Sequence, residues 1–136
     1  MRKVNNIVIH CTATVQSAKP ASIINYWKKN LGWKSPGYHR LIEADGTIHE
    51  LSNFEFPTNG VAGHNADSIH ISYIGGVDSK NIPLDNRTVE QRCAILHCIE
   101  EARKLYPNAR ILGHRDFPKV AKACPSFDAI SEYKNL

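Results

Sequence analysis

Long apolar runs are missing from the 136-residue sequence, and none approaches the roughly 20 residues that a membrane span requires. The basic start of the chain leads into Asn5 and Asn6 and then into only a few apolar residues, too few for the core of a signal peptide. The sequence also has no evident tail, linker or internal repeat. These absences predict a single domain over residues 1–136 that does not enter a membrane. They also indicate a chain made in the cytoplasm, or one that has lost its leader.

Positive charges only slightly outnumber negative charges. The 17 basic and 13 acidic side chains leave a formal net charge of +4. No cluster of Lys and Arg interleaved with aromatic residues argues for nucleic acid specifically, so no nucleic-acid partner is expected. A mild positive charge suits a polyanion, but a solvated surface explains it better. The charge alone therefore identifies no partner, and we expect a monomer.

The compact metal-binding motifs CxxC and HExxH do not occur, so spacing alone indicates a metal site only weakly. Of the four cysteines, Cys93 and Cys98 lie five residues apart on a predicted helix, and five residues turn a helix well away from its starting face. We therefore expect no bridge between them and interpret all four cysteines as reduced, which leaves a thiolate free for a metal. The other two are Cys11 and Cys124.

The pattern of apolar residues predicts an α/β domain built around one sheet. Short β-branched or alternating runs indicate strands, and Asp45-Gly46 is typical of a hairpin tip. The segment 53–67 is rich in turn-forming residues and is expected to be a long surface loop. Strands are expected at 6–10, 37–43, 48–51, 69–74 and 109–112, and helices at 20–30, 88–106 and 127–133.

The helix at 88–106 has the strongest signal. Thr88 and Gln91 form a capping box, and Pro107 ends the run. One broad apolar face of this helix requires cover from the sheet. We expect that face to hold Val89, Cys93, Ile95, Leu96, Ile99, Ala102 and Tyr106.

Three residues stand out as candidate metal ligands. His10 ends a buried strand, where a side chain can be held rigidly at the sheet edge. His114 and Cys124 lie ten residues apart in a loop that contains prolines, and such a loop can return the thiolate to face the imidazole. Two imidazoles and one thiolate suit tetrahedral zinc and leave a fourth position open for water, as in catalytic zinc sites.

Several segments, in the same order along nearly the whole chain, resemble the zinc amidase family that includes phage amidase-type lysozymes and peptidoglycan recognition proteins. The two segments nearest the C-terminus are highly specific together. The segments are Ile-Val-Ile-His-Cys-Thr-Ala-Thr at 7–14, Gly-Trp-Lys-Ser-Pro-Gly-Tyr-His at 32–39, Asp-Gly-Thr-Ile at 45–48, Asp-Ser-Ile at 67–69, Ile-Gly-Gly at 74–76, Gly-His-Arg-Asp at 113–116 and Lys-Ala-Cys-Pro-Ser-Phe-Asp at 122–128.

The resemblance implies a central mixed sheet flanked by helices and cleavage of the amide bond between muramic acid and L-alanine in bacterial peptidoglycan. It implies one zinc ion bound by His10, His114 and Cys124. It also implies that Tyr38 and Lys122 lie beside the metal, where a phenol or a cation can stabilise an oxyanion or assist proton transfer. His64 and Asn65 in the long loop are weaker candidates for substrate contact, and Asn65 matches the family pattern better.

Other polar residues are assigned lesser roles. His39 is expected to point to the face opposite that of its neighbour Tyr38, and Cys11 to the face opposite that of His10. Both are therefore expected to be structural. Asp116 either orients a ligand imidazole or caps its own loop, and the sequence favours neither.

The chain departs from the family pattern at three places. Leu51-Ser52-Asn53 replaces a common Gly-Arg after the hairpin. His64 follows Gly63, whereas the family histidine precedes the loop glycine. His70 stands in the place of a strand glycine.

Two other functions compete with amidase activity. The first is a recognition domain that binds the stem peptide without cutting it, although such domains typically lack the cysteine that Cys124 provides here. The second is a cysteine hydrolase that pairs Cys124 or Cys11 with a histidine and needs no metal. A phage lysin, a wall-remodelling enzyme and a delivered toxin all fit the sequence, as does any type of stem peptide.

Overall fold

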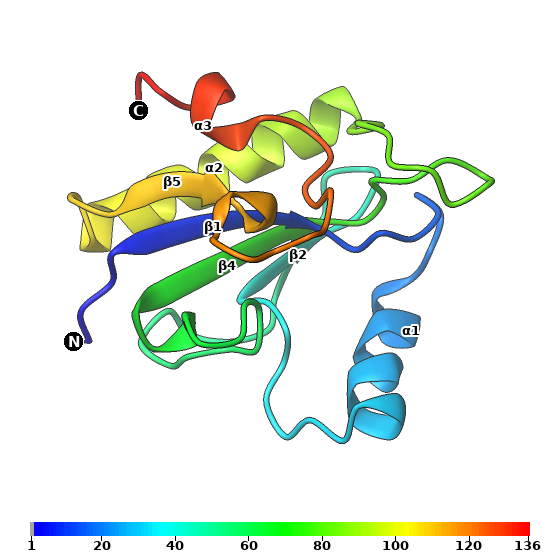
Figure 1. Ribbon diagram of the computed structural model, residues 1–136, viewed down its shortest axis with the longest axis horizontal. Coiled ribbons are helices and arrows are strands. Elements are labelled where there is room, and N and C mark those ends of the chain that lie inside the picture. The colour runs from blue at the N-terminus through cyan, green and yellow to red at the C-terminus, as the bar shows by residue number, and fades with distance from the viewer. Residues whose placement is uncertain (1) are drawn as a thin grey trace.

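A mixed five-stranded sheet, in the order β3-β2-β4-β1-β5, organises residues 2–136, the part of the chain that the computed structural model describes (Figure 1). β1 is parallel to its neighbours β4 and β5, β2 is parallel to β4, and β3 is antiparallel to β2. This arrangement confirms the expected α/β fold with a central mixed sheet. The strands are β1 (Asn6–Cys11), β2 (Arg40–Ile42), β3 (Ile48–Glu50), β4 (Ser68–Tyr73) and β5 (Arg110–Gly113).

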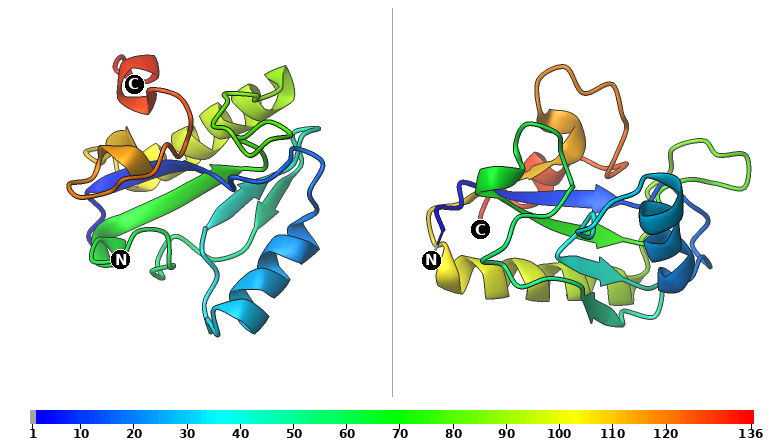
Figure 2. Two further views of the ribbon diagram at one scale, coloured as in Figure 1. Left: turned by 45° about the vertical axis from the view of Figure 1, so that its right-hand side comes forward. Right: turned by 90° about the horizontal axis from the view of Figure 1, so that it is seen from below.

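Both faces of the central strands are covered, and every residue of β1 and β4 is buried. Helix α2 (Val89–Leu105) covers one face, and the loop before β4 and the segment after β5 cover the other (Figure 2). Alternate residues of a strand point to opposite faces. Ile7 and Ile9 therefore join the core beneath α2, whereas Val8 packs in a separate cluster on the other face. The side chain of His10 lies on the same face as Val8.

Helix α2 begins and ends as expected. Gln91 N–H donates to Thr88 Oγ1 at 3.0 Å and Thr88 N–H donates to Gln91 Oε1 at 3.1 Å, which confirms the capping box. The predicted buried face was partly wrong, because Val89, Cys93 and Leu96 are exposed. Gln91 lies at the sheet instead, where its amide donates to the carbonyls of Ile42 and Ile74, and the buried face is rotated accordingly. It consists of Gln91, Ala94, Ile95, Cys98, Ile99 and Ala102.

This rotated face leads to a stability prediction. Ile95 is fully buried in the main core, so Ile95→Ala should lower the free energy of unfolding by about 2–5 kcal/mol. Val89 on the same helix is 71% exposed, so Val89→Ala should change it by less than about 0.5 kcal/mol. Urea denaturation of both variants measures the difference, and equal losses would mean that the face is assigned incorrectly.

Two other elements differ from the expected boundaries. The helix expected at 20–30 is α-helical only over α1 (Pro20–Asn25) and continues as a π-helical turn over Tyr26–Asn30. The strand expected at 37–43 is reduced to β2. Its first residues are held by the long loop instead, since Thr58 Oγ1 donates to the carbonyl of Gly37 and Asn59 N–H donates to that of Pro36.

The C-terminal part also matches in outline. A short helix, α3 (Ala129–Glu132), forms within the region expected at 127–133, and the Asp128 side chain accepts from Ser131 N–H at 3.1 Å at its start. All four cysteines are free, as expected. Within residues 2–136, no helix is both long and apolar enough to cross a membrane.

Candidate metal centre

The two candidate histidines meet because β1 and β5 are parallel neighbours. The register pairs Ile9 with Gly113, so His10 and His114 follow at the same edge of the sheet. Their ring centroids are 4.9 Å apart. His10 is buried, whereas His114 is half-buried. The carboxyl ends of parallel strands are a common place for functional sites.

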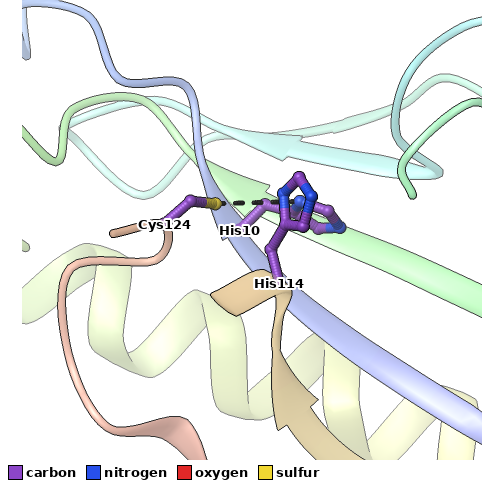
Figure 3. Close-up of side chains that lie close together, drawn as sticks. All are labelled: His10, His114 and Cys124. Carbon is purple, nitrogen blue, oxygen red and sulfur yellow. Dashed lines mark hydrogen bonds between the residues drawn. The ribbon is translucent and has the colours of Figure 1, made fainter. Parts of the chain in front are cut away.

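The segment after β5 brings Cys124 back to these histidines. Arg115 N–H donates to the Cys124 carbonyl at 2.9 Å, which pins the return of the loop. Cys124 Sγ lies 3.8 Å from His10 Nδ1 and faces it directly (Figure 3). Cys11 N–H also donates to this sulfur at 3.1 Å. The possible ligand atoms of His10, His114 and Cys124 all lie within 4.8 Å of one another.

These three residues form a group that could hold a metal ion. Two nitrogen donors and one sulfur donor suit zinc, which prefers such ligands in a tetrahedral arrangement. Three protein ligands leave one position for water or substrate, which distinguishes catalytic zinc sites from structural ones. The donor set therefore fits a catalytic zinc ion.

Burial sets the protonation of the three groups. Burial, with the neighbouring His70 and His114, lowers the pKa of His10 well below its usual value. Burial, with a smaller contribution from the charge of Lys122, lowers the pKa of His114 to about 4. Both imidazoles are therefore neutral near pH 7, the form that binds a metal.

Burial also raises the pKa of the Cys124 thiol. Without a metal ion the sulfur is therefore a poor nucleophile at neutral pH, because the thiolate is the reactive form. A bound cation deprotonates a coordinating thiol. The Cys124 sulfur is therefore better suited to bind a metal than to act as the nucleophile of a cysteine hydrolase.

A cavity of about 690 Å³ opens over the three candidate ligands. Tyr38 and Lys122 lie on its wall, so the structure brings both predicted catalytic residues to the same place. Aromatic side chains from the helical region and the segment that follows it form another part of the wall. The lining includes His10, His114, Cys124, Tyr38, Lys122, Asn59, Gly60, Tyr26, Trp27 and Trp33.

Tyr38 is held close to the candidate ligands. Its ring centroid is 5.0 Å from that of His10 and 5.3 Å from that of Trp27, and its hydroxyl donates to the Cys11 carbonyl at 3.4 Å. Burial raises the pKa of this phenol, so it remains a protonated donor at neutral pH. Lys122 is exposed and adds positive charge at the wall of the cavity.

The weaker candidates lie elsewhere. Neither His64 nor Asn65 is among the residues that line the cavity. The His64 ring contacts Phe117, with 4.5 Å between ring centroids. Asn65 is directed inward, and its Oδ1 accepts from Val61 N–H at 2.9 Å.

The three residues that were expected to be structural or of undecided role, Asp116, His39 and Cys11, all make structural contacts. Asp116 Oδ2 accepts from Gly113 N–H at 2.7 Å, so the carboxylate caps its own loop. His39 is buried, and its Nε2 lies 2.7 Å from the Phe56 carbonyl, in agreement with a structural role. Cys11 belongs to the main core, as expected.

Sequence reasoning missed the contact between His70 and His10. His70 Nδ1 lies 2.8 Å from His10 Nε2. The signal was available in part, because the alternation of β4 puts His70 on the face opposite Ile69 and Ile71. The pairing of His70 with Val8 then places it diagonally beside His10.

Comparison with known proteins agrees with this geometry. The N-acetylmuramoyl-L-alanine amidase family matches residues 1–127. The endolysin of Enterobacteria phage K11 is 34% identical over 128 residues, which cover 93% of this chain and 83% of the endolysin. A peptidoglycan-recognition protein of Drosophila melanogaster is 26% identical over 140 residues, which cover 98% of this chain and 75% of that protein.

A solved structure extends the agreement to the fold. The endolysin of a Thermus scotoductus bacteriophage superposes with a TM-score of 0.80 at 25% sequence identity, covering 97% of this chain and 83% of that one. The chain therefore belongs to the N-acetylmuramoyl-L-alanine amidase family.

Proposed function

We propose that residues 1–136 form one domain, a zinc-dependent hydrolase of the amide bond between N-acetylmuramic acid and L-alanine in peptidoglycan. The observation that carries the proposal is the convergence of two neutral imidazoles and one cysteine at the base of an open cavity. Family membership supports the choice of bond. We assign His10, His114 and Cys124 as the zinc ligands.

A zinc ion held by these three residues would supply an activated water at neutral pH and would polarise the amide carbonyl. The residues around it have separate tasks. Tyr38 donates a hydrogen bond from its protonated phenol to the carbonyl oxygen as negative charge develops there. Lys122 adds a positive charge at the cavity wall that favours the same charge development. The aromatic wall excludes water from one side of the bound substrate, which strengthens both interactions.

The substrate is a polymer outside the membrane, so the enzyme acts on the cell wall after release or export from the cytoplasm. The open cavity suits access to an insoluble strand by a single protomer. Endolysin relatives support a phage-type lytic role. A monomer is sufficient for this chemistry, since the proposed ligands and both catalytic residues come from one chain.

Non-catalytic recognition of peptidoglycan is the second candidate function. The likeness to a peptidoglycan-recognition protein favours it. A binding domain needs a cavity for the stem peptide but no set of metal donors. Cleavage accounts for both features, and recognition accounts only for the cavity.

Metal removal tests the proposal. Dialysis against a chelator should abolish the clearing of purified cell walls, and stoichiometric Zn²⁺ should restore it, whereas Mg²⁺ should not, because nitrogen and sulfur ligands disfavour it. A thiol–imidazole hydrolase would keep its rate in the chelator. Full activity of protein shown by elemental analysis to lack zinc would therefore refute the metal-dependent mechanism.

A further inference from the structure

A chain of hydrogen bonds runs from the long loop through His70 to the candidate ligand His10. Asn65 Oδ1 accepts from Val61 N–H at 2.9 Å and lies 2.8 Å from His70 Nε2. His70 Nδ1 lies 2.8 Å from His10 Nε2. The other ring nitrogen of His10, Nδ1, faces Cys124 Sγ. The chain thus reaches His10 on the side away from the proposed metal.

The backbone at Val61 determines the direction of every bond in this chain. A backbone N–H can only donate, so Asn65 presents its side-chain oxygen, which can only accept. His70 must then donate from Nε2, and since a neutral imidazole carries one N–H, its Nδ1 accepts. His10 must therefore donate from Nε2, and its free lone pair lies on Nδ1.

The His70 ring is held firmly enough to impose this order. The side chain is fully buried, and its backbone N–H donates to His39 Nδ1 at 3.0 Å. Its ring stacks on that of His39, with centroids 6.0 Å apart and planes 22° apart. The backbone of Gly60 passes so close that a Cβ there would overlap the His70 ring. The ring therefore has little freedom to turn away from His10.

We propose that His70 is a positioning residue that, with Asn65, holds His10 in the Nε2–H tautomer and presents its Nδ1 lone pair to the metal. The inference rests on the proposed function, because it requires His10 to be a ligand. Partners that orient a ligand histidine in this way typically contribute roughly 10–100-fold in metal affinity. His70 stands where the family pattern has glycine, so the device belongs to this chain and not to the general pattern.

The tautomer can be measured on the unmodified, metal-free protein. Long-range proton–nitrogen correlation spectra of ¹⁵N-labelled protein distinguish a protonated ring nitrogen from a bare one. We expect His10 and His70 each to carry the proton on Nε2. A proton on His10 Nδ1 in the neutral ring would overturn the inference.

Zinc affinity provides the second readout, measured by competition with a chromogenic chelator. His70→Ala should weaken zinc binding by about 10–100-fold. His70→Asn should recover most of the loss, because its Oδ1 takes the place of the accepting Nδ1. His97→Ala removes an exposed histidine of α2 and should leave the affinity unchanged. A folded His70→Ala protein with the unmodified affinity would contradict the inference.

The same experiments separate this inference from the proposed function. If the unmodified protein does not bind zinc, both fail. If it binds zinc, loses it in Cys124→Ala and keeps the unmodified affinity in His70→Ala, only the positioning role of His70 fails. Should His70→Ala not fold, the tautomer of the unmodified protein still decides.

Discussion

Replacement of Cys124 by alanine should remove zinc from the protein and reduce cell-wall hydrolysis to the background rate. The thiol lies against His10 at the base of the cavity, and its loss leaves only two protein ligands. Catalytic zinc sites use three protein ligands, so we expect that two imidazoles alone do not hold the ion through purification. Elemental analysis and turbidity loss of purified walls measure the two effects.

The matched control is Cys93→Ala. Cys93 is an exposed cysteine on α2, so this variant removes a thiol without touching the cavity. It should retain stoichiometric zinc and full activity. Full zinc occupancy in Cys124→Ala would exclude this cysteine as a ligand and with it the proposed donor set.

Tyr38→Phe should retain zinc and stability but reduce the catalytic rate by roughly 10²–10³-fold, the usual effect of removing one donor that stabilises an oxyanion. The hydrogen bond from the hydroxyl to the Cys11 carbonyl is long, at 3.4 Å, so its removal should cost the fold little. The raised pKa keeps the phenol protonated, which makes it a donor throughout the neutral range.

Tyr106→Phe is the control for Tyr38. Its hydroxyl is buried at the end of α2 and does not line the cavity, so the variant removes the same atom from a different place. It should have the unmodified rate. Steady-state rates on soluble muropeptides compare the two variants, and an unchanged rate in Tyr38→Phe would reduce Tyr38 to a packing role.

The two candidate histidines could be predicted because each depends on local sequence. His10 ends a run of β-branched residues, and His114 directly follows another strand. Their meeting depends on these strands being parallel neighbours, whereas the resemblance implied only a central mixed sheet. Cys124 could not be placed by periodicity, because its segment is irregular; the prolines of the loop allowed its return, and the family pattern indicated it.

The errors arose where a tertiary contact reversed a local preference. Val89 and Leu96 are apolar but exposed, whereas Gln91 is polar but buried, because its amide satisfies two carbonyls of the sheet. No apolar pattern contains that hydrogen bond. The register of α2 on the sheet was therefore predictable only approximately.

His70 illustrates the same limit at the candidate site. Its alternation with Ile69 and Ile71 predicts its face, but an exposed histidine on a polar face and a buried one beneath a loop look alike in sequence. The loop that contains Asn65 covers this face. Asn65 contacts one ring nitrogen of His70, and the other ring nitrogen contacts His10. Asn65, predicted as a substrate contact, lies behind the candidate metal site for the same reason.

The bond that is cut tests the central claim most directly. Purified muropeptides digested with the zinc-loaded protein should yield, by mass spectrometry, free stem peptides with an L-alanine amino terminus and intact glycan strands without new reducing ends. New reducing sugar ends would indicate a glycosidase, and undigested muropeptides that remain bound to the protein would indicate a recognition domain. Either result would contradict the assignment of this chain as an amidase.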